Sequence, residues 1–366
     1  MVVSDSVGVY LDTNTCHFHF SNLKLTNLFL AQSMDDFLSA DRQVKYAAFH
    51  VPFDKRDTSW LERIELLYNQ VNKIFIFCSE LHEHTVQSLI KLDRPKIIIF
   101  ICGHINYQFK NASVYTWLDW FVTSVHFYKV VRPALLNEKL DSNKQKKYFF
   151  DILLGCQRAH RDFVYNYIHS QNLNDKVVMT YFRYWNRDLR ETEHIFETEG
   201  LEFLEESSYT HSVHCVKYYG YKMNLAQIVP FTIYNDCYYT LITETNAVNE
   251  FNFFTEKTVK PILAKRLFIA VAGQGFLKIL KSFGFRTFDT VIDESYDLEP
   301  DHATRWSMAL DQLRYLTTVD PDVVQNQIKD IVKHNQTLML GREWYDDLVI
   351  RLNAEIEQDL ARTVEH

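Results

Sequence analysis

The sequence is poor in glycine and proline, with only 9 and 7 of them among 366 residues. That scarcity leaves little room for disordered linkers. The few glycines form no G-x-x-x-x-G-K, G-x-G-x-x-G or G-x-S-x-G motif, and Gly273-Gln274-Gly275 alone is a weak signal. The sequence therefore disfavours a P-loop kinase and a dinucleotide-dependent oxidoreductase, and it does not support a hydrolase with a nucleophile elbow.

Paired cysteines and long apolar stretches are also missing. No two of the 6 cysteines are closer than 22 residues, so no C-x-x-C metal signature exists, and the pattern favours buried free thiols in a reducing compartment. No run approaches the roughly 18 apolar residues of a membrane span. The opening MVVSDSVGVYLDTNT lacks the basic and apolar regions of a signal peptide. We expect a soluble, cytoplasmic protein with no membrane span.

An excess of positive charge is absent as well. The chain has 39 Lys and Arg against 47 Asp and Glu, a net charge of −8. This balance argues against a protein that coats nucleic acid non-specifically, but it does not exclude a local basic cleft. The length is sufficient for two domains with separate cores.

What the sequence does contain is an alternation of apolar strands and amphipathic helices, clearest between Tyr238 and Asp297. We predict a strand at Tyr238–Glu244, a helix that begins at Thr255, a buried strand at Leu267–Ala272 and a second helix to Ser282. This is a β-α-β pattern, whose ligands bind beyond the carboxyl ends of the strands.

Charged residues stand at that edge of the predicted sheet. Glu244 ends a strand, Thr255 can cap the next helix, and Glu256, Lys257 and Lys260 follow. A carboxylate here can accept hydrogen bonds from ribose hydroxyls, and a lysine beside a helix N-terminus can neutralise a diphosphate, which together suit a sugar nucleotide. The alternative is an ordinary first helical turn, where an acidic residue is favoured anyway.

A second predicted phosphate site follows the strand Tyr148–Leu154. Gly155-Cys156-Gln157 leads into a helix with Arg158 and Arg161 at its start, and both could contact a diphosphate. The alternative is that both arginines lie three apart on a solvated helix face. Farther along, Phe182–Arg187 mixes aromatic residues with arginines and could stack a base or a sugar, or simply begin a helix with buried rings.

The first part of the chain reads as another α/β domain. We predict strands at Val7–Leu11, Tyr46–His50, Lys73–Cys78 and Lys96–Cys102, and helices around 25–38, 60–71, 85–92 and 115–127. Ser79 is expected to cap the helix after the third strand, with Glu80 and Glu83 in its first turn. His82-Glu83 lacks the i, i+4 histidine spacing of a helical zinc site, so no metal site is predicted.

The expected domain boundaries follow from composition. Residues 1–131 form the first domain, the polar and basic stretch 132–147 is the linker, and 148–340 form the second domain. Helices are predicted at Thr304–Leu316, Val323–Leu340 and Arg342–Leu360. Asp293, Glu294 and Asp297 lack the ligand pattern of an EF-hand, so we expect them to fix loop geometry.

Two stretches carry a resemblance to a known family. TETN, followed by FFTEKTVKPILAKRLFIAVAGQGFLKILKSFGFRTF, resembles the donor-binding half of fucosyltransferase-like GT-B glycosyltransferases. With GFRTFDTVIDESYD and Arg305-Trp306, the pattern also resembles uncharacterised proteins of large tailed phages of the cyanophage type. The resemblance covers about residues 148–340.

The resemblance implies a fold and a chemistry. The fold would be two Rossmann-like domains whose parallel sheets face a cleft, plus C-terminal helices, with 341–366 packing back on the first domain. Glu256 would hold the ribose and Lys257 a phosphate, and no metal or other cofactor would be needed. A first-domain side chain would deprotonate the acceptor. The candidates for this base are Glu80, Glu83, His104 and Asp119.

Two functions are therefore weighed. The first is a glycosyltransferase that moves a sugar from a nucleotide-sugar donor to a hydroxyl acceptor. If the chain is phage-encoded, it would act in the host cytoplasm on a hydroxymethylpyrimidine in DNA or on a surface glycan. The acidic balance makes DNA the less secure choice. The alternative is a non-catalytic binding or virion-associated protein on the same scaffold.

Overall fold

The computed structural model describes residues 7–12, 29–40, 42, 44–51, 58–141, 144–181, 199–204 and 215–364. The chain divides into two compact units, one formed by Met1–Asp119 with Glu343–His366 and the other by Trp120–Arg342. Each unit contains a parallel sheet with helices, so the predicted α/β class is confirmed.

The boundary between the units differs from the expected one. The second unit begins at Trp120, so the segment 132–147 lies inside it rather than between two domains. Part of this segment forms the helix α6 (Leu135–Lys139), and Lys146 Nζ donates to the carbonyl of Tyr234 at 3.0 Å. The polar, basic composition of this segment indicated a linker, but these contacts fix the segment to the second unit.

The first unit is built on a parallel sheet in the order β2-β1-β3-β4-β5-β7. Its elements are β1 (Val7–Leu11), β2 (Phe29–Ala31), α2 (Met34–Ser39), β3 (Val44–His50), α3 (Ser59–Leu67), β4 (Lys73–Cys78), α4 (Glu83–Lys91), β5 (Ile97–Ile101), β6 (Gly103–Ile105), β7 (Ser113–Thr116) and α13 (Asp346–Val364). The central strands β4 and β5 are buried along their whole length, which explains their uninterrupted apolar sequences.

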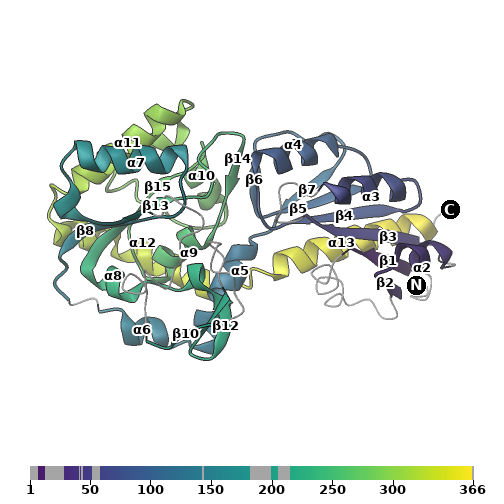
Figure 1. Cartoon of the computed structure of the whole chain (residues 1–366), viewed down its shortest axis with the longest axis horizontal. Coiled ribbons are helices and arrows are strands. Elements are labelled where there is room, and N and C mark those ends of the chain that lie inside the picture. Colours follow the sequence, from purple (N-terminus) through teal and green to yellow (C-terminus); the bar gives the residue numbers. More distant parts are fainter. Residues whose placement is uncertain are drawn as a thin grey trace. The chain divides into compact units, whose positions relative to one another are not determined.

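The C-terminal helix α13 completes the core of the first unit. Helix α13 lies along one face of the sheet (Figure 1). Its residues Leu348, Leu352 and Ile356 pack against alternate residues of β1, β3, β4 and β5. A buried ion pair adds to this packing, because Lys73 Nζ lies 2.6 Å from Glu355 Oε2 and also donates to the Glu355 carbonyl at 2.7 Å. The first unit is thus made of two separate parts of the sequence.

The second unit has a parallel sheet in the order β15-β13-β8-β9. Its elements are α5 (Asp119–His126), η2 (Phe127–Val131), α6 (Leu135–Lys139), β8 (Tyr148–Leu154), α7 (Ala159–Ser170), η3 (Asn174–Lys176), β9 (Val177–Tyr181), β10 (Leu201–Phe203), β11 (Cys215–Tyr218), β12 (Tyr221–Asn224), η5 (Leu225–Gln227), α8 (Phe231–Asp236), β13 (Cys237–Thr243), β14 (Phe251–Phe253), α9 (Glu256–Leu263), β15 (Phe268–Val271), α10 (Phe276–Ser282), η6 (Glu294–Leu298), α11 (His302–Leu316) and α12 (Pro321–Gly341). The strands β10, β11 and β12 form a separate antiparallel sheet that the sequence patterns did not indicate.

Helices cover both faces of this second parallel sheet. The helices α7 and α11 lie over one face, and α9 and α12 lie over the other (Figure 1). A buried arginine before β15 joins β8 and β13: Arg266 donates to Asp151 at 2.7 Å and to Thr240 Oγ1 at 2.9 Å. It also donates to main-chain carbonyls, those of Tyr234, Cys237 and Tyr239.

In both parallel sheets the order of the strands reverses beside the first strand of the sheet in sequence. In the first unit β1 lies between β2 and β3, and in the second unit β8 lies between β9 and β13. At such a switch point the loops that leave two neighbouring strands diverge to opposite faces, which leaves room for a ligand at the carboxyl ends. These ends are Leu11 and His50 in the first unit and Leu154 and Thr243 in the second.

Most of the expected elements are confirmed, and a few expectations were wrong. Strand positions at Val7–Leu11, Lys73–Cys78, Tyr148–Leu154 and Val177–Tyr181 are as predicted, and the three C-terminal helices are present. The helix expected around 25–38 is wrong in part, because Phe29–Ala31 is a strand and 25–28 lie outside the described residues. The helix expected at 115–127 begins only at Asp119, because Tyr115 belongs to β7.

Candidate functional site

The start of α9 is held by the carboxylate of Glu244, which is fully buried at the end of β13. Glu244 Oε1 accepts from Thr258 Oγ1 at 2.6 Å and from Thr255 N at 3.2 Å. Its Oε2 accepts from Thr255 Oγ1 at 2.7 Å and from Thr245 N at 3.2 Å. Four protein donors therefore surround one carboxylate. The side chain predicted to bind a donor instead anchors the helix that carries the next candidates.

Thr255 caps α9 as predicted. Its hydroxyl accepts from the backbone N–H of Lys257 at 3.3 Å, and the chain is extended at this position. The ammonium of Lys257 turns back over the same turn, 3.1 Å from Thr255 Oγ1 and 3.2 Å from Thr245 Oγ1. The Lys257 side chain is 22% exposed, so among Glu244, Thr255 and Lys257 it is the lysine that reaches solvent.

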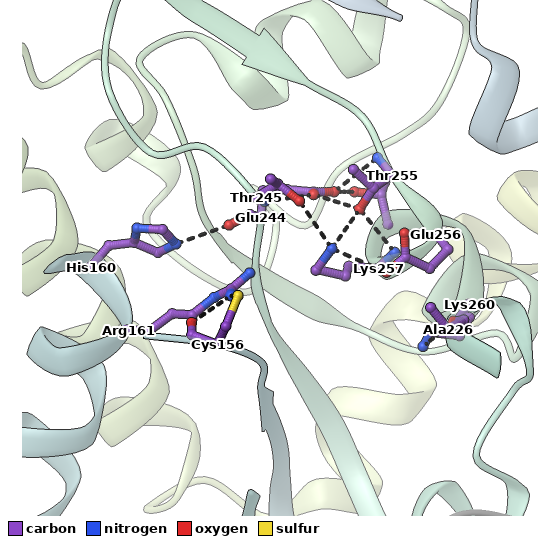
Figure 2. A network of polar contacts seen from close by, with 11 residues as sticks. Cys156, His160, Arg161, Ala226, Glu244, Thr245, Thr255, Glu256, Lys257 and Lys260 are labelled. Atoms are coloured by element: carbon purple, nitrogen blue, oxygen red, sulfur yellow. Dashed lines mark hydrogen bonds and ion pairs between the residues drawn. The ribbon is translucent and has the colours of Figure 1, made fainter. Parts of the chain in front are cut away.

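Glu256 is buried beside two lysines. Its Oε1 lies 3.0 Å from Lys257 Nζ. Burial alone would raise the pKa of Glu256, but the charges of Lys257 and Lys260 outweigh it and hold this pKa below its usual value. Lys260 itself donates to the carbonyl of Ala226 at 2.8 Å, and burial lowers its pKa. Lys260 therefore points away from the Thr255 hydroxyl that Lys257 contacts (Figure 2).

The start of α7 brings cationic side chains to the same end of the sheet. Arg161 is only 3% exposed, and its Nη1 donates to the Cys156 carbonyl at 2.8 Å. Gly155 leaves room for this side chain, since a Cβ there would lie 3.1 Å from Arg161 Nη1. Arg158 is half-buried one turn earlier. Among the described residues the Nε atoms of both arginines are buried without a hydrogen-bond acceptor.

His160 connects the two helix starts. Its Nε2 lies 2.9 Å from the carbonyl of Glu244, and because a carbonyl can only accept, this nitrogen carries the proton. Burial and then the charges of Arg161, Arg158 and Lys257 lower the pKa of His160 to about 3. Figure 2 shows His160 and Arg161 on one side of Glu244 and the start of α9 on the other. No local sequence pattern distinguishes His160, because its contact with Glu244 joins residues 84 positions apart.

The positive charge of this cluster exceeds its negative charge. We call Arg158, Arg161 and Lys257, which lie at the carboxyl ends of β8 and β13, the cation cluster. Glu256 pairs with Lys257, while no carboxylate in the described part of the chain forms an ion pair with Arg158 or Arg161. Burial, together with the neighbouring Arg158, lowers the pKa of Arg161, although the charge of Glu244 acts in the opposite direction. Such an arrangement, beside a helix N-terminus, binds anions.

A buried arginine and a tryptophan brace the loops around this cluster. Arg305 donates to the carbonyls of Ala272, Glu299 and Ala247, and so joins the loops that leave β15 and β13. The ring of Trp306 stacks on His302 and contacts His160 and Phe163. The pair Arg305-Trp306, noted in the sequence only through a resemblance, thus supports the candidate site from α11.

The acid–base candidates of the first unit have different surroundings. Glu80 pairs with His82 at 3.1 Å, and Glu83 is exposed in the first turn of α4. His104 is exposed on β6, where its side chain hydrogen-bonds with Asn106. Asp119 is half-buried and hydrogen-bonds with Ser79, and burial raises its pKa to about 6.

The sequence pattern predicted that Ser79 caps α4, and this prediction was wrong. The N-cap position is His82, whose side chain makes no capping hydrogen bond. Ser79 instead contacts Asp119 and, at 3.0 Å, His50 Nε2. The turn after β4 holds it there, because Cys78 Sγ donates to the Glu80 carbonyl at 3.0 Å.

The acidic residues near α10 fix loop geometry, as predicted. Asp297 accepts from the backbone N–H groups of Leu277 and Lys278, at 2.8 and 3.0 Å. Asp293 accepts from Ser295 N at 2.9 Å. Within the described ranges no group of three His, Cys, Asp or Glu side chains could hold a metal ion. The predicted aromatic and basic segment Phe182–Arg187 lies outside these ranges.

Comparisons with known proteins do not identify a family. No protein-family model matches the chain, and no curated protein matches it either. In the part of the chain that the structure describes, no helix has both the length and the apolar character needed to cross a membrane.

Proposed function

We propose that this protein is a glycosyltransferase of the GT-B type that takes a sugar from a nucleotide-sugar donor. The donor's diphosphate would bind at the cation cluster. The observation that carries this proposal is that Arg158 and Arg161 lack any carboxylate partner among the described residues, with both Nε atoms buried and unpaired. A buried guanidinium without a counter-charge is costly, so its presence indicates an anionic ligand that pairs with it.

The proposed ligand has more than one phosphate because the cations come from two helix starts. Arg158 and Arg161 belong to the start of α7, while Lys257 belongs to the start of α9. Guanidinium groups bind phosphate oxygens in pairs, and a lysine binds them as a point charge. A diphosphate has enough oxygens to contact both helix starts.

Chemically, these cations would stabilise the leaving group. When the bond between the anomeric carbon and the diphosphate oxygen breaks, the electron pair stays on the diphosphate. Fixed positive charges and the N–H groups of a helix start can stabilise that charge without reorganisation. This is the work that a divalent cation does in other transferases, so the proposed mechanism requires no metal or other cofactor.

The two carboxylates at this edge receive different roles. We assign Glu256 to the ribose hydroxyls, because its carboxylate has one charged partner, Lys257. Glu244 has no such role, since four protein donors already occupy its oxygens. The acceptor would be a hydroxyl group, either of a modified DNA base such as a hydroxymethylpyrimidine or of a surface glycan.

Binding of nucleoside diphosphates tests the donor site. UDP, GDP, ADP and CDP, and their sugar conjugates, would be titrated by calorimetry into the wild-type protein and into Arg158→Ala. Removing one charge-assisted contact should weaken binding by roughly tenfold to a hundredfold. Arg314→Ala is the matched control, because Arg314 is exposed on α11 and its contacts are long, 3.4 Å to Asp311 and 3.5 Å to Gln171 Oε1.

The outcomes separate the functions. Binding of one nucleotide family that depends on Arg158 but not on Arg314, with release of the nucleoside diphosphate from its sugar conjugate, would support the transferase. Binding without any release, with every acceptor class offered, would favour a non-catalytic binding protein. If no nucleoside diphosphate binds at millimolar concentration, the proposal is wrong.

A further inference from the structure

A free thiol lies beside the cation cluster and has no role in the proposed function. Cys156 belongs to the turn between β8 and α7, and it is half-buried. Its Sγ lies 3.6 Å from Arg161 Nη1, and its main-chain carbonyl accepts from the same nitrogen at 2.8 Å. Figure 2 shows the sulfur atom next to the guanidinium group of Arg161. The thiol therefore contacts a cation to which we assign an anionic ligand.

The guanidinium group of Arg161 is fixed in this position. The residue is almost fully buried, and its side chain passes close to Gly155, where a Cβ would lie 3.1 Å from Nη1. Within the described ranges the hydrogen bonds of this side chain go to Cys156, and its Nε is buried without an acceptor. A buried positive charge whose hydrogen-bond partners are neutral is costly. The cost indicates a site for a negative charge, and the sulfur of Cys156 lies at that site.

The other described cysteines have different surroundings. Three of them are fully buried: Cys78, Cys102 and Cys237. Cys215 on β11 is half-buried like Cys156, but its Sγ lies 3.6 Å from the neutral amide oxygen of Asn224. In the part of the chain that the structure describes, Cys156 is thus the half-buried thiol that contacts a cation, and Cys215 is its counterpart in a neutral setting.

We propose that Cys156 is a modification site, at which its thiol forms a mixed disulfide with a small anionic thiol compound, and that this modification blocks the cation cluster. The kind of compound follows from the charges, because positive side chains attract negative reagents and repel positive ones. A carboxylate of the attached group pairs with Arg161 or Arg158 in place of a phosphate. That the blocked ligand is a diphosphate rests on the proposed function, whereas the modification itself does not.

The modification is a thiol–disulfide exchange. The Cys156 thiol loses its proton to solvent, and the resulting thiolate attacks one sulfur of an anionic disulfide such as glutathione disulfide. A bond forms between this sulfur and Sγ, the disulfide bond of the reagent breaks, and its other half leaves as a thiolate with the electron pair. Cys156 is thereby oxidised, and the leaving half is reduced. Positive charge beside a sulfur favours the thiolate, which is the reactive form. An added thiol reverses the exchange.

The charge preference of the reagent tests the modification site in the wild-type protein alone. Glutathione disulfide is anionic, 2-hydroxyethyl disulfide is neutral and cystamine is cationic, and mass spectrometry of peptides gives the rate of each at Cys156 and Cys215. We expect the ratio of the anionic to the cationic rate to be at least about tenfold higher at Cys156 than at Cys215. This difference should shrink as the salt concentration rises. Equal ratios at the two cysteines overturn the modification site.

Arg158→Gln tests whether the cation cluster causes the preference. Arg158 is half-buried at the N-cap position of α7, so the exchange removes a charge beside Cys156 and leaves the buried Arg161 in place. The rate ratio at Cys156 should fall toward the ratio at Cys215. Arg314→Gln is the matched control and should leave both ratios unchanged. A ratio at Cys156 that is the same in Arg158→Gln and in the wild type contradicts the role of the cluster.

The second part measures the effect on ligand binding. The nucleoside diphosphate that binds best is titrated by calorimetry into the wild type before and after reaction with glutathione disulfide. Its Kd should rise at least about tenfold, as expected for the loss of a charge-assisted contact, and dithiothreitol should restore it. Cys156→Ser keeps the carbonyl that holds Arg161, so it should bind like the untreated wild type and should not respond to the reagent.

The outcomes separate this proposal from the proposed function. An unchanged Kd in protein that mass spectrometry shows to be modified at Cys156 overturns the blocking of the cluster. If no nucleoside diphosphate binds the untreated protein, the proposed function is wrong. Inorganic pyrophosphate is then the probe for blocking, and the rate ratios at Cys156 and Cys215 still decide whether the modification site exists.

Discussion

Replacing Glu244 with glutamine tests whether this residue anchors α9. The exchange keeps size and shape but turns one carboxylate oxygen into an NH₂ group. Each oxygen accepts from one backbone N–H and one threonine hydroxyl, so whichever oxygen is lost, the new donor faces two donors. A hydroxyl can rotate and accept, but the N–H of Thr245 or Thr255 cannot. At least one buried N–H therefore loses its acceptor.

The expected cost follows from these contacts. A buried donor without an acceptor costs about 1–3 kcal/mol, and hydrogen bonds to a charged group contribute more than neutral ones. Because the remaining contacts also lose the full negative charge, Glu244→Gln should lower the free energy of unfolding of the second unit by about 2–4 kcal/mol. Thr258→Val removes one hydroxyl contact of 2.6 Å and should cost about 1–2 kcal/mol.

Urea unfolding gives the change in stability, and hydrogen exchange of peptides that cover residues 255–263 shows where it arises. The amides of the first turn of α9 should exchange faster in Glu244→Gln, while those of the first unit should be unchanged. Glu250→Gln is the matched control, because Glu250 is exposed in the loop after β13. If Glu244→Gln is as stable as Glu250→Gln, and α9 exchanges at the wild-type rate, the anchoring role is refuted.

Two further predictions concern buried charges. Arg266→Met leaves Asp151 buried without its cation, and it should lower the free energy of unfolding by about 3–5 kcal/mol in urea unfolding at pH 7; a cost below about 1 kcal/mol would contradict the pairing. For Asp119, the pKa in the folded protein, about 6, lies above the ordinary 3.8, so ionisation of this residue reduces stability as the pH rises from about 4 to about 6. In urea unfolding, Asp119→Asn should therefore be about 1–3 kcal/mol more stable than the wild type at pH 7.5, with a difference that shrinks toward pH 4. Equal stability of the two proteins at both pH values would show that burial does not disfavour the ionised carboxylate.

Local patterns were sufficient to predict the elements around the cation cluster. The apolar strands and the N-cap Thr255 are encoded within a few residues, and Arg158 and Arg161 stand at a helix start, where the helix dipole also favours an anion. The role of Glu244 could not be predicted in this way. A glutamate at a strand end fits a ribose ligand equally well until the donors around its oxygens are known, and three of the four donors come from a turn 11 to 14 residues later.

The contacts of Ser79 join residues that are far apart in the sequence. His50 ends β3, Ser79 follows the neighbouring strand β4, and Asp119 comes after a third strand, β7. Strand order determines which strand ends meet, and apolar periodicity carries no information about strand order. Ser79 therefore resembled a helix cap, because the sequence after it satisfies the capping pattern. In the structure the helix begins four residues later, at Glu83.

The contribution of α13 to the first unit bears on the order in which the chain can fold during synthesis. Translation proceeds from the N-terminus, so the strands β1 to β7 leave the ribosome long before Leu348, Leu352 and Ile356, which cover one face of their sheet. The second unit is complete in sequence by Arg342 and can fold first. Until α13 is made, the first sheet keeps an apolar face without its helix, and we expect the nascent chain to be most prone to aggregation at that stage.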